Sequence, residues 1–223
     1  MCTPSKKHKK ILYLHCNPRV DTKMEGREHL RYQEYEFHIL QKLSENLVFK
    51  KHVSITFVHT YNEAKRILHK ESFWMVYFAG HGNVEGLHLL DQNKDASETV
   101  SYDKLFDLFG SLNPGARCLV MNACLTGGQA SFKAAMRRRQ DTVEYVIGTM
   151  RTISDAEGSW FSFLFFRFLL SDRNTISSAF DLALLELSKI PFSGARNGPH
   201  FYLSALHNIG TEPSPEDYYF AIN

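Results

Sequence analysis

The chain has 223 residues, of which 43% are hydrophobic and 13% aromatic, enough for one large buried core without a second domain. The formal net charge is only +2, so charge alone favours neither nucleic acid nor a membrane surface as a partner. The most apolar stretch, residues 160–170, is far shorter than a membrane-spanning helix and contains Arg167. From these properties, binding to nucleic acid or to a membrane is not the expected role.

The four cysteines, Cys2, Cys16, Cys118 and Cys124, do not suggest a disulfide framework. Cys118 and Cys124 fall within one predicted strand, about 20 Å apart, which is beyond the reach of a disulfide. The amino-terminal residues MCTPSKKHKK are not followed by the long apolar region of a signal peptide. Both observations predict reduced thiols and a cytoplasmic protein.

Apolar runs and amphipathic segments alternate along most of the chain. In order, they predict strand 10–14, helix 30–47, strand 52–59, helix 62–70, strand 72–82, a hairpin at 86–90 and 97–99, helix 102–109, strand 117–124, helix 129–140, strand 143–150, helix 156–170, helix 174–190 and strand 200–209. The apolar stripe of the first helix consists of Leu30, Phe37, Leu40, Leu43 and Leu47. Because helical connections join parallel strands, this order predicts a three-layer α/β domain with a mostly parallel central sheet.

Reactive side chains stand at the predicted strand ends, where parallel sheets gather their ligands and catalytic groups. The strand in SFWMVYFAGHG stops at a Gly-His-Gly turn that carries His81, and the strand in RCLVMNAC ends at Cys124. Neighbouring parallel strands would present this histidine and cysteine together. Further polar residues at strand ends are His15, Asn17, Thr60, Thr149 and Asp155.

A paired cysteine and histidine can transfer an acyl group to water through a thioester. The thiolate is the nucleophile, and His81 or the N-terminus of the helix predicted from Gly128 would stabilise it. The backbone amides of Gly82 and Cys124 are the candidates for the oxyanion hole. His81 would then protonate the departing amine.

Each half of this pair also has a plainer explanation. A cysteine at a strand end is often a small buried hydrophobe, and a Gly-His-Gly sequence is often only a turn. A zinc site built from His15, Cys16, His81 and Cys124 would lack the usual short ligand spacings, so we expect no metal. The glycines of GHGNVEG miss the spacing of a dinucleotide site, so we expect no cofactor. The order of the two motifs in an α/β chain favours the catalytic interpretation.

Several segments together carry a family resemblance. They are ILYLHCNPRVDTKMEG at the start, VYFAGHG with the glycine-rich hairpin after it, VMNAC, VIGTMRTISD, NTISSAFDLAL and GPHFYLSALHNIG. These segments resemble the caspase-related CHAT peptidases over residues 10–210, which leaves a basic tail at 1–9 and a C-terminal tail at 211–223. The most specific part is the order His-Gly and then Cys, with a separation of 43 residues, near the value of about 50 in caspases.

The resemblance implies a caspase-like (caspase-hemoglobinase) fold and a cysteine endopeptidase whose dyad is His81 and Cys124. It also implies a protein substrate and a cytoplasmic role in bacterial antiviral defence or signalling, gated by a protein partner. Since the domain takes up most of the chain, we expect activation by another protein, by self-association or by cleavage near residues 137–139. The alternative is a catalytically silent caspase-like module that binds a partner.

The resemblance does not determine which substrate side chain the pocket selects. Met121-Asn122-Ala123 precedes the cysteine where caspases have Gln-Ala, and no arginine stands in an obvious pocket-forming place, so specificity for aspartate is not expected. Metacaspase-like and gingipain-like relatives select Arg or Lys through acidic residues. Asn122 and Asp155 are the candidates for the pocket, although Asp155 is at least as well suited to be the N-cap of the following helix, for which Ser154 is the other candidate.

Overall fold

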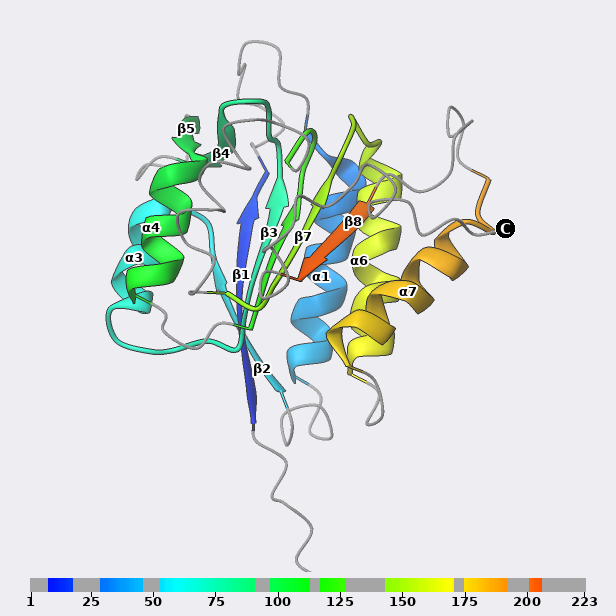
Figure 1. Ribbon diagram of the computed structural model, residues 1–223, viewed down its shortest axis with the longest axis horizontal. Helices are drawn as coiled ribbons and strands as arrows, with labels where there is room; N and C mark the ends of the chain where they lie inside the picture. The colour runs from blue at the N-terminus through cyan, green and yellow to red at the C-terminus, as the bar shows by residue number, and fades with distance from the viewer. Residues whose placement is uncertain are drawn as a thin grey trace, which may run out of the picture.

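A six-stranded sheet forms the middle layer of the protein (Figure 1). The computed structural model describes residues 8–17, 29–45, 53–90, 97–112, 117–126, 143–170, 175–191 and 201–205. The strands are β1 (Lys9–Cys16), β2 (Val53–Val58), β3 (Met75–Gly80), β6 (Cys118–Asn122), β7 (Tyr145–Thr149) and β8 (Phe201–Ala205). Their spatial order is β2-β1-β3-β6-β7-β8, and all neighbours are parallel except β7 and β8. The prediction of a mostly parallel sheet is confirmed.

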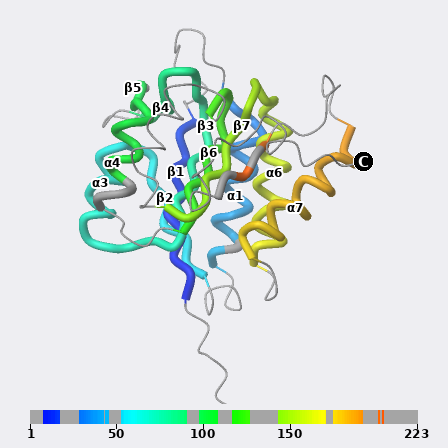
Figure 2. Tube along the Cα trace, viewed as in Figure 1, coloured from blue at the N-terminus to red at the C-terminus, as the bar shows by residue number. Residues whose placement is uncertain are grey.

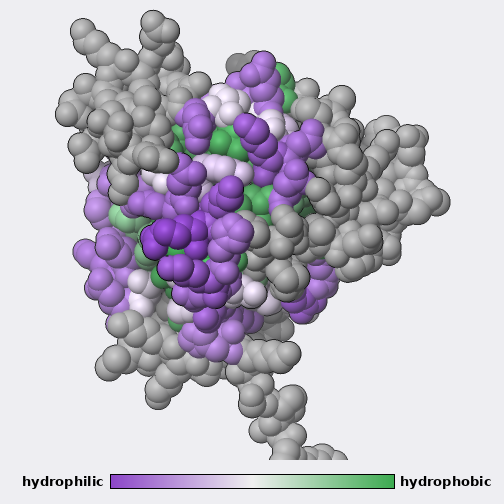
Figure 3. All heavy atoms as spheres, turned by 90° about the vertical axis from the view of Figure 1, so that its left-hand side faces the viewer, coloured by the Kyte–Doolittle hydropathy of each residue, from purple (hydrophilic) through white to green (hydrophobic). Residues whose placement is uncertain are grey.

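Helices cover both faces of this sheet, which confirms the predicted three layers (Figure 1). One face carries α3 (Tyr61–Leu68) and α4 (Tyr102–Leu112), and the opposite face carries α1 (Arg31–Glu45), α6 (Asp155–Leu169) and α7 (Ile176–Leu187). The outer surface on the side of α3 and α4 is mainly hydrophilic (Figure 3). None of the helices in the described ranges combines the length and apolar character needed to cross a membrane. The helix predicted at 129–140 lies outside the described residues.

The core alternates residue by residue along the central strands. In β3, Val76 and Phe78 pack on the side of α3 and α4, whereas Tyr77 and Ala79 pack on the side of α1, α6 and α7. This alternation follows from the two-residue period of a strand, and it explains why a strand covered on both faces is apolar throughout. Every residue of β3 is buried.

A small antiparallel hairpin follows β3, as predicted from the glycine-rich sequence. It pairs β4 (Gly86–Leu90) with β5 (Ser97–Ser101) and stands apart from the main sheet. A Cβ atom at position 86 would overlap the carbonyl group of Val100. Glycine is therefore required where the hairpin begins, only a few residues after His81.

Side-chain caps fix where three helices begin. Thr60, Ser154 and Thr175 are the N-caps of α3, α6 and α7, and each accepts a hydrogen bond from a backbone amide of the first turn. Thr60 is also part of a capping box with Glu63. The start of α3 therefore lies one residue before the predicted boundary, at Tyr61.

Candidate active site

The pairing of β3 with β6 brings His81 and Cys124 to the same edge of the sheet. The two strands are neighbours in the centre of the sheet (Figure 2), and Ala79 pairs with Asn122, a separation of 43 residues. His81 and Cys124 have this same separation, and each lies two residues beyond this last pair of the two strands. The structure therefore brings the ends of the two strands that carry these motifs side by side.

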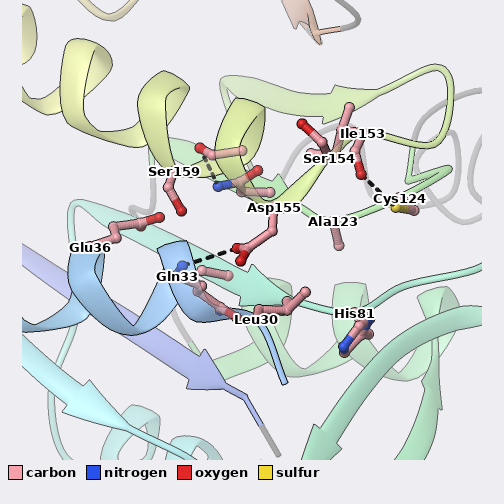
Figure 4. A pocket seen from close by; sticks show the side chains of 14 residues that line it. Leu30, Gln33, Glu36, His81, Ala123, Cys124, Ile153, Ser154, Asp155 and Ser159 are labelled. Atoms are coloured by element: carbon pink, nitrogen blue, oxygen red, sulfur yellow. Dashed lines mark hydrogen bonds between the residues drawn. The ribbon is translucent and has the colours of Figure 1, made fainter. Parts of the chain in front are cut away.

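A cavity of about 40 Å³ opens beside the two residues, with room for roughly three water molecules. It is lined by residues 79–81 at the end of β3, by residues 122–124 at the end of β6, by residues 153–155 at the start of α6, and by residues from the inner faces of α1 and α6. His81 and Cys124 lie at one end of the cavity, and Glu36 and Ser159 lie at the other (Figure 4).

The two motifs are also in direct contact. A Cβ atom at position 82 would lie 3.0 Å from the Cβ of Ala123 and 3.1 Å from the backbone oxygen of Cys124. A side chain at position 82 would therefore be crowded against the cysteine turn, and glycine lets the chain after His81 pack this closely without a shift. The sequence Gly-His-Gly is therefore more than a generic turn, because its second glycine provides the contact with the second motif.

The sequence predicted that Cys124 is the last residue of its strand. In the structure Cys124 lies two residues beyond the end of the strand, in a turn. β6 ends at Asn122, and Leu125 has a positive φ of 58°, which costs a leucine about 1 kcal/mol. The partly buried Cys124 thiol donates to the backbone oxygen of Ile153 at 3.6 Å. Burial raises the pKa of this thiol above its usual value, so the resting cysteine is a neutral thiol.

Two buried threonines hold this turn: Thr149, which the sequence placed at a strand end, and Thr126, which the sequence analysis missed. Thr126 Oγ1 donates to the backbone oxygens of Met121 and Ala123 at 3.0 and 3.2 Å, and Thr149 Oγ1 donates to that of Ala123 at 2.5 Å. Thr126 Oγ1 in turn accepts from the Thr149 amide at 3.0 Å. These bonds tie the cysteine turn to the end of β7. In the sequence, the signals for this role were a threonine two residues after the cysteine and another threonine at the end of the next strand.

The backbone around the histidine is fixed by the hairpin. The backbone oxygen of His81 accepts from the amide of His88 on β4 at 3.0 Å. Asn83 Oδ1 accepts from the amides of Glu85 and Gly86, and Tyr102 donates its hydroxyl to the Asn83 backbone oxygen at 2.7 Å. The loop that carries His81 is therefore bonded to β4 and to α4.

Asn122 lines the cavity and joins the sheet to α6. Its Nδ2 donates to the backbone oxygen of Gly158 at 2.9 Å and to Ser162 Oγ at 2.8 Å. A Cβ atom at position 158 would lie 2.9 Å from Asn122 Oδ1, so this close approach depends on glycine. Asn122 thus has a structural role in addition to its predicted place at the pocket.

Asp155 also lines the cavity, but its carboxylate is held by another helix. Of the two N-caps predicted for α6, Ser154 is confirmed, and Asp155 does not cap this helix. Asp155 instead accepts from the amides of Tyr32 at 2.7 Å and Gln33 at 3.0 Å, at the N-terminus of α1. An acidic side chain is favourable there because of the free amides and the helix dipole.

The inner face of α1 includes buried polar side chains, whereas the apolar stripe in the sequence predicted only hydrophobic side chains there. Gln33 and Glu36 are 3% and 5% exposed, as buried as Leu40 on the same face. Glu36 Oε1 accepts from the hydroxyl of Tyr13 at 2.5 Å, and burial raises the pKa of this carboxyl to about 8. Gln33, Glu36 and Leu40 are spaced so that they share one face of the helix. A search for apolar residues alone overlooks this spacing, because two of the three residues are polar.

Other predicted strand-end residues do not reach the cavity. His15 is buried beside Phe37, with a pKa lowered to about 3 by burial. Asn17 bonds both backbone groups of Leu30 before α1, and Thr60 caps α3. Within the described ranges, no group of three or more His, Cys, Asp or Glu side chains is arranged to hold a metal ion.

Several solved structures with this architecture are cysteine proteases of low sequence identity to this chain. A secreted C11 cysteine protease from Bacteroides thetaiotaomicron, in complex with an irreversible peptide inhibitor, aligns with a TM-score of 0.60 and 10% identity over 90% of this chain and 66% of its own. Pro-sf-caspase-1 aligns with a TM-score of 0.56 and 11% identity over 90% of this chain and 92% of its own. The Arg-specific cysteine proteinase gingipain R aligns with a TM-score of 0.51 and 10% identity over 81% and 42%.

No protein-family model and no curated protein matches the sequence. The chain spans less than two thirds of the C11 protease and of gingipain R. Identities near 10% establish a shared fold and leave function to the residues of the site. The chain has the caspase-like α/β fold that these cysteine proteases share.

Proposed function

We propose that this protein is a cysteine endopeptidase with His81 and Cys124 as its catalytic dyad. The observation that carries the proposal is the register of β3 and β6, which puts both residues at one cavity on the carboxyl edge of the sheet. The caspase-like fold of several cysteine proteases adds support.

In the first step, Cys124 Sγ attacks the carbonyl carbon of the scissile peptide bond while His81 accepts the thiol proton. The tetrahedral oxyanion receives hydrogen bonds from the backbone amides of Gly82 and Cys124. His81 then gives the proton to the leaving amine, and a thioester with Cys124 remains. Water, deprotonated by His81, hydrolyses the thioester and restores the thiol.

For this reaction, the Cys124 thiol must exchange its present hydrogen-bond acceptor for His81. It donates to the Ile153 backbone oxygen, and burial keeps its pKa high. Substrate binding beside Ile153 would release the thiol from this carbonyl and direct it toward His81. Activation by a partner protein, as the resemblance implies, would act on the same bond.

The resemblance supports a finer assignment within this class. We place the protein among CHAT-type peptidases that act in the cytoplasm, in bacterial antiviral defence or signalling, under the control of a protein partner. The subsite for the substrate side chain before the scissile bond lies in the cavity bordered by Asn122 and Asp155.

The test is cleavage of a peptide library, read by mass spectrometry, with the wild type and with Cys124→Ala and His81→Ala. Both substitutions should reduce cleavage at least about 1,000-fold. Cys118→Ala is the matched control, because Cys118 lies on β6 but is fully buried and outside the cavity. Cleavage that survives Cys124→Ala would refute the proposal.

A catalytically silent module that binds a partner is the second candidate. The neutral Cys124 thiol, bonded to a carbonyl rather than to a base, is the observation in its favour. Alkylation by iodoacetamide separates the two, since a dyad predicts selective, pH-dependent modification of Cys124 that His81→Ala slows. A silent module predicts that Cys124 reacts no faster than an exposed reference thiol and that His81→Ala leaves its rate unchanged.

A further inference from the structure

The residue at the N-cap position of α1 cannot cap this helix with its side chain. This residue is Leu30, whose backbone oxygen accepts the first helical bond, from the Glu34 amide at 3.2 Å. A leucine side chain accepts no hydrogen bond, so the amides of the first turn need another acceptor. Asp155, at the start of α6, supplies it by accepting from the amides of Tyr32 at 2.7 Å and Gln33 at 3.0 Å. The cap of α1 therefore comes from α6.

The segment that carries this cap is also bonded to the turn that carries the cysteine. The Leu125 amide donates to the backbone oxygen of Arg151 at 3.2 Å, and the Cys124 thiol donates to that of Ile153 at 3.6 Å. Asp155 follows two residues later, and Figure 4 shows its bond to α1 together with the bond of the thiol. One short segment therefore joins the first turn of α1 to the nucleophile.

The bond to Ile153 keeps the thiol out of the reaction. A carbonyl oxygen only accepts hydrogen bonds, so this bond exists only while the sulfur of Cys124 keeps its proton. The species that attacks a peptide bond is the thiolate. The position of the Ile153 carbonyl therefore decides whether the thiol is available to His81.

The capped turn of α1 also faces the cavity. Asp155 and Gln33 both line it, and Gln33 is only 3% exposed. Within the described part of the chain, neither polar atom of the Gln33 side chain has a hydrogen-bond partner. A substrate group that enters the cavity would therefore meet the first turn of α1 beside its cap. Occupation of the cavity and displacement of α1 would act on the same bonds.

We propose that Asp155 is a positioning residue that keeps Cys124 latent. By capping α1, it anchors residues 153–155 so that the Ile153 carbonyl stays on the Cys124 thiol. Separation of the first turn of α1 from Asp155 frees this segment and lets the thiol turn to His81. This inference rests on the proposed function, since only a nucleophilic cysteine needs such control, and it names the movement that activation requires.

The first experiment measures alkylation of Cys124 by iodoacetamide as a function of pH, with the modified peptide identified by mass spectrometry. Asp155→Ala should react at least about fivefold faster than the wild type at pH 7, with its pH profile shifted to lower pH, because the released thiol ionises beside His81. A purely structural Asp155 would change the stability of the protein and leave the pH profile where it is.

A second pair of variants tests the cap without removing a charge. Tyr32→Pro removes the amide that donates to Asp155, and it breaks no helical bond, because the amides of the first turn have no acceptor within the helix. Tyr32→Ala is the matched control, since it removes the same half-exposed side chain and keeps the amide. We expect Tyr32→Pro to accelerate alkylation at least about threefold and Tyr32→Ala to react like the wild type.

Two further variants control for charge. Glu34→Gln removes a carboxylate from the same turn of α1, beside His15 and His38 rather than α6, and should have no effect. Asp155→Asn keeps an acceptor for one amide and should fall between the wild type and Asp155→Ala. An equal effect of Asp155→Asn and Asp155→Ala, with none from Tyr32→Pro, would show that charge alone matters and would overturn the inference.

The double variant Asp155→Ala/His81→Ala separates this inference from the proposed function. Acceleration by Asp155→Ala that disappears without His81 would support both. Acceleration that persists without His81 would support the control by Asp155 and count against the dyad. Unchanged alkylation in both Asp155→Ala and Tyr32→Pro would overturn the inference, and peptide cleavage that depends on Cys124 would still support the peptidase.

Discussion

Both sides of the central sheet bury a large apolar cluster, but the side of α1 and α6 also buries a network of polar groups, and it is called the polar side below. On the side of α3 and α4, β3 and β6 contribute apolar side chains such as Phe78 and Met121. On the side of α1 and α6, the adjacent positions are Tyr77 and Asn122, whose polar groups both bond to Ser162. One residue along a strand thus separates an apolar core from a polar network.

The difference shows how stability and chemistry are divided in this fold. On the apolar side, stability depends on the volume and shape of the packed side chains and not on their charge. The polar side continues from Tyr13 and Tyr77 through Glu36 and Asn122 to the cavity, so its hydrogen bonds also determine the geometry of the site. Substitutions at neighbouring strand positions should therefore have different kinds of effect.

The largest effect is expected on the apolar side, from Phe78→Ala. Phe78 is fully buried, and its truncation should lower the free energy of unfolding by about 3–5 kcal/mol through lost burial and a cavity. Urea denaturation provides the measurement, and Phe78→Leu is a milder control. The alkylation rate of Cys124 in the folded fraction should not change. A changed rate would mean that the two sides are not independent.

The next effect is a pH dependence from the polar side. Unfolded chains lose the Glu36 proton above about pH 4, whereas the folded protein keeps it up to about pH 8. The stability contribution is thus complete at low pH and is lost as the pH rises through the pKa of Glu36.

Glu36→Gln removes this titration while keeping an acceptor for the Tyr13 hydroxyl. Relative to the wild type, it should gain roughly 3–4 kcal/mol in unfolding free energy between pH 4.5 and pH 9. Denaturation at several pH values checks this, with Glu34→Gln as the control. Parallel pH profiles for the wild type and Glu36→Gln would show that Glu36 has an ordinary pKa.

A smaller loss is expected from Asn122→Ala, about 2–3 kcal/mol, because Gly158 and Ser162 lose their bonds to the Nδ2 group. Met121→Leu, at the adjacent position on the apolar side, conserves volume and should cost less than about 1.5 kcal/mol. Asn122→Ala should also slow peptide cleavage, whereas Met121→Leu should not. Equal effects on cleavage would contradict the division between the two sides.

The smallest effect concerns Thr149→Val, which removes the bond to the Ala123 backbone oxygen. We expect a loss of about 1–2 kcal/mol in stability, from one buried carbonyl left short of a donor. The alkylation rate of Cys124 should change as well, since this bond holds the cysteine turn. A purely structural threonine would alter stability and leave the pH profile of alkylation unchanged.

The sequence could predict those features that depend on local pattern. Apolar runs predicted the strands, glycine predicted the hairpin after His81, and the matching strand ends predicted that His81 and Cys124 meet. The orientation of β8 is not encoded in this way, because an apolar run has no direction. Its antiparallel pairing depends on the path of the chain between helix and strand.

The site contains side chains whose roles depend on tertiary contacts. Asp155 reads as a local cap, yet it bonds to α1, more than a hundred residues earlier in the chain. Gln33 and Glu36 read as solvent-facing because they are polar, yet α6 and the sheet bury them. Polar burial depends on partners from other elements, and hydrophobic periodicity contains no information about them.

The register shared by β3 and β6 has a consequence for engineering. Because hydrogen bonding between β3 and β6 brings the two strand ends together, the length of chain between His81 and Cys124 does not determine that both follow strands at the same edge of the sheet. Leu90 and Ser97 are paired, so the ends of the connection from β4 to β5 are anchored side by side. Peptide tags inserted between these two anchors, or even a break in the chain there, should leave the dyad aligned, which makes this connection the natural place to attach a reporter or divide the protein into two complementing fragments.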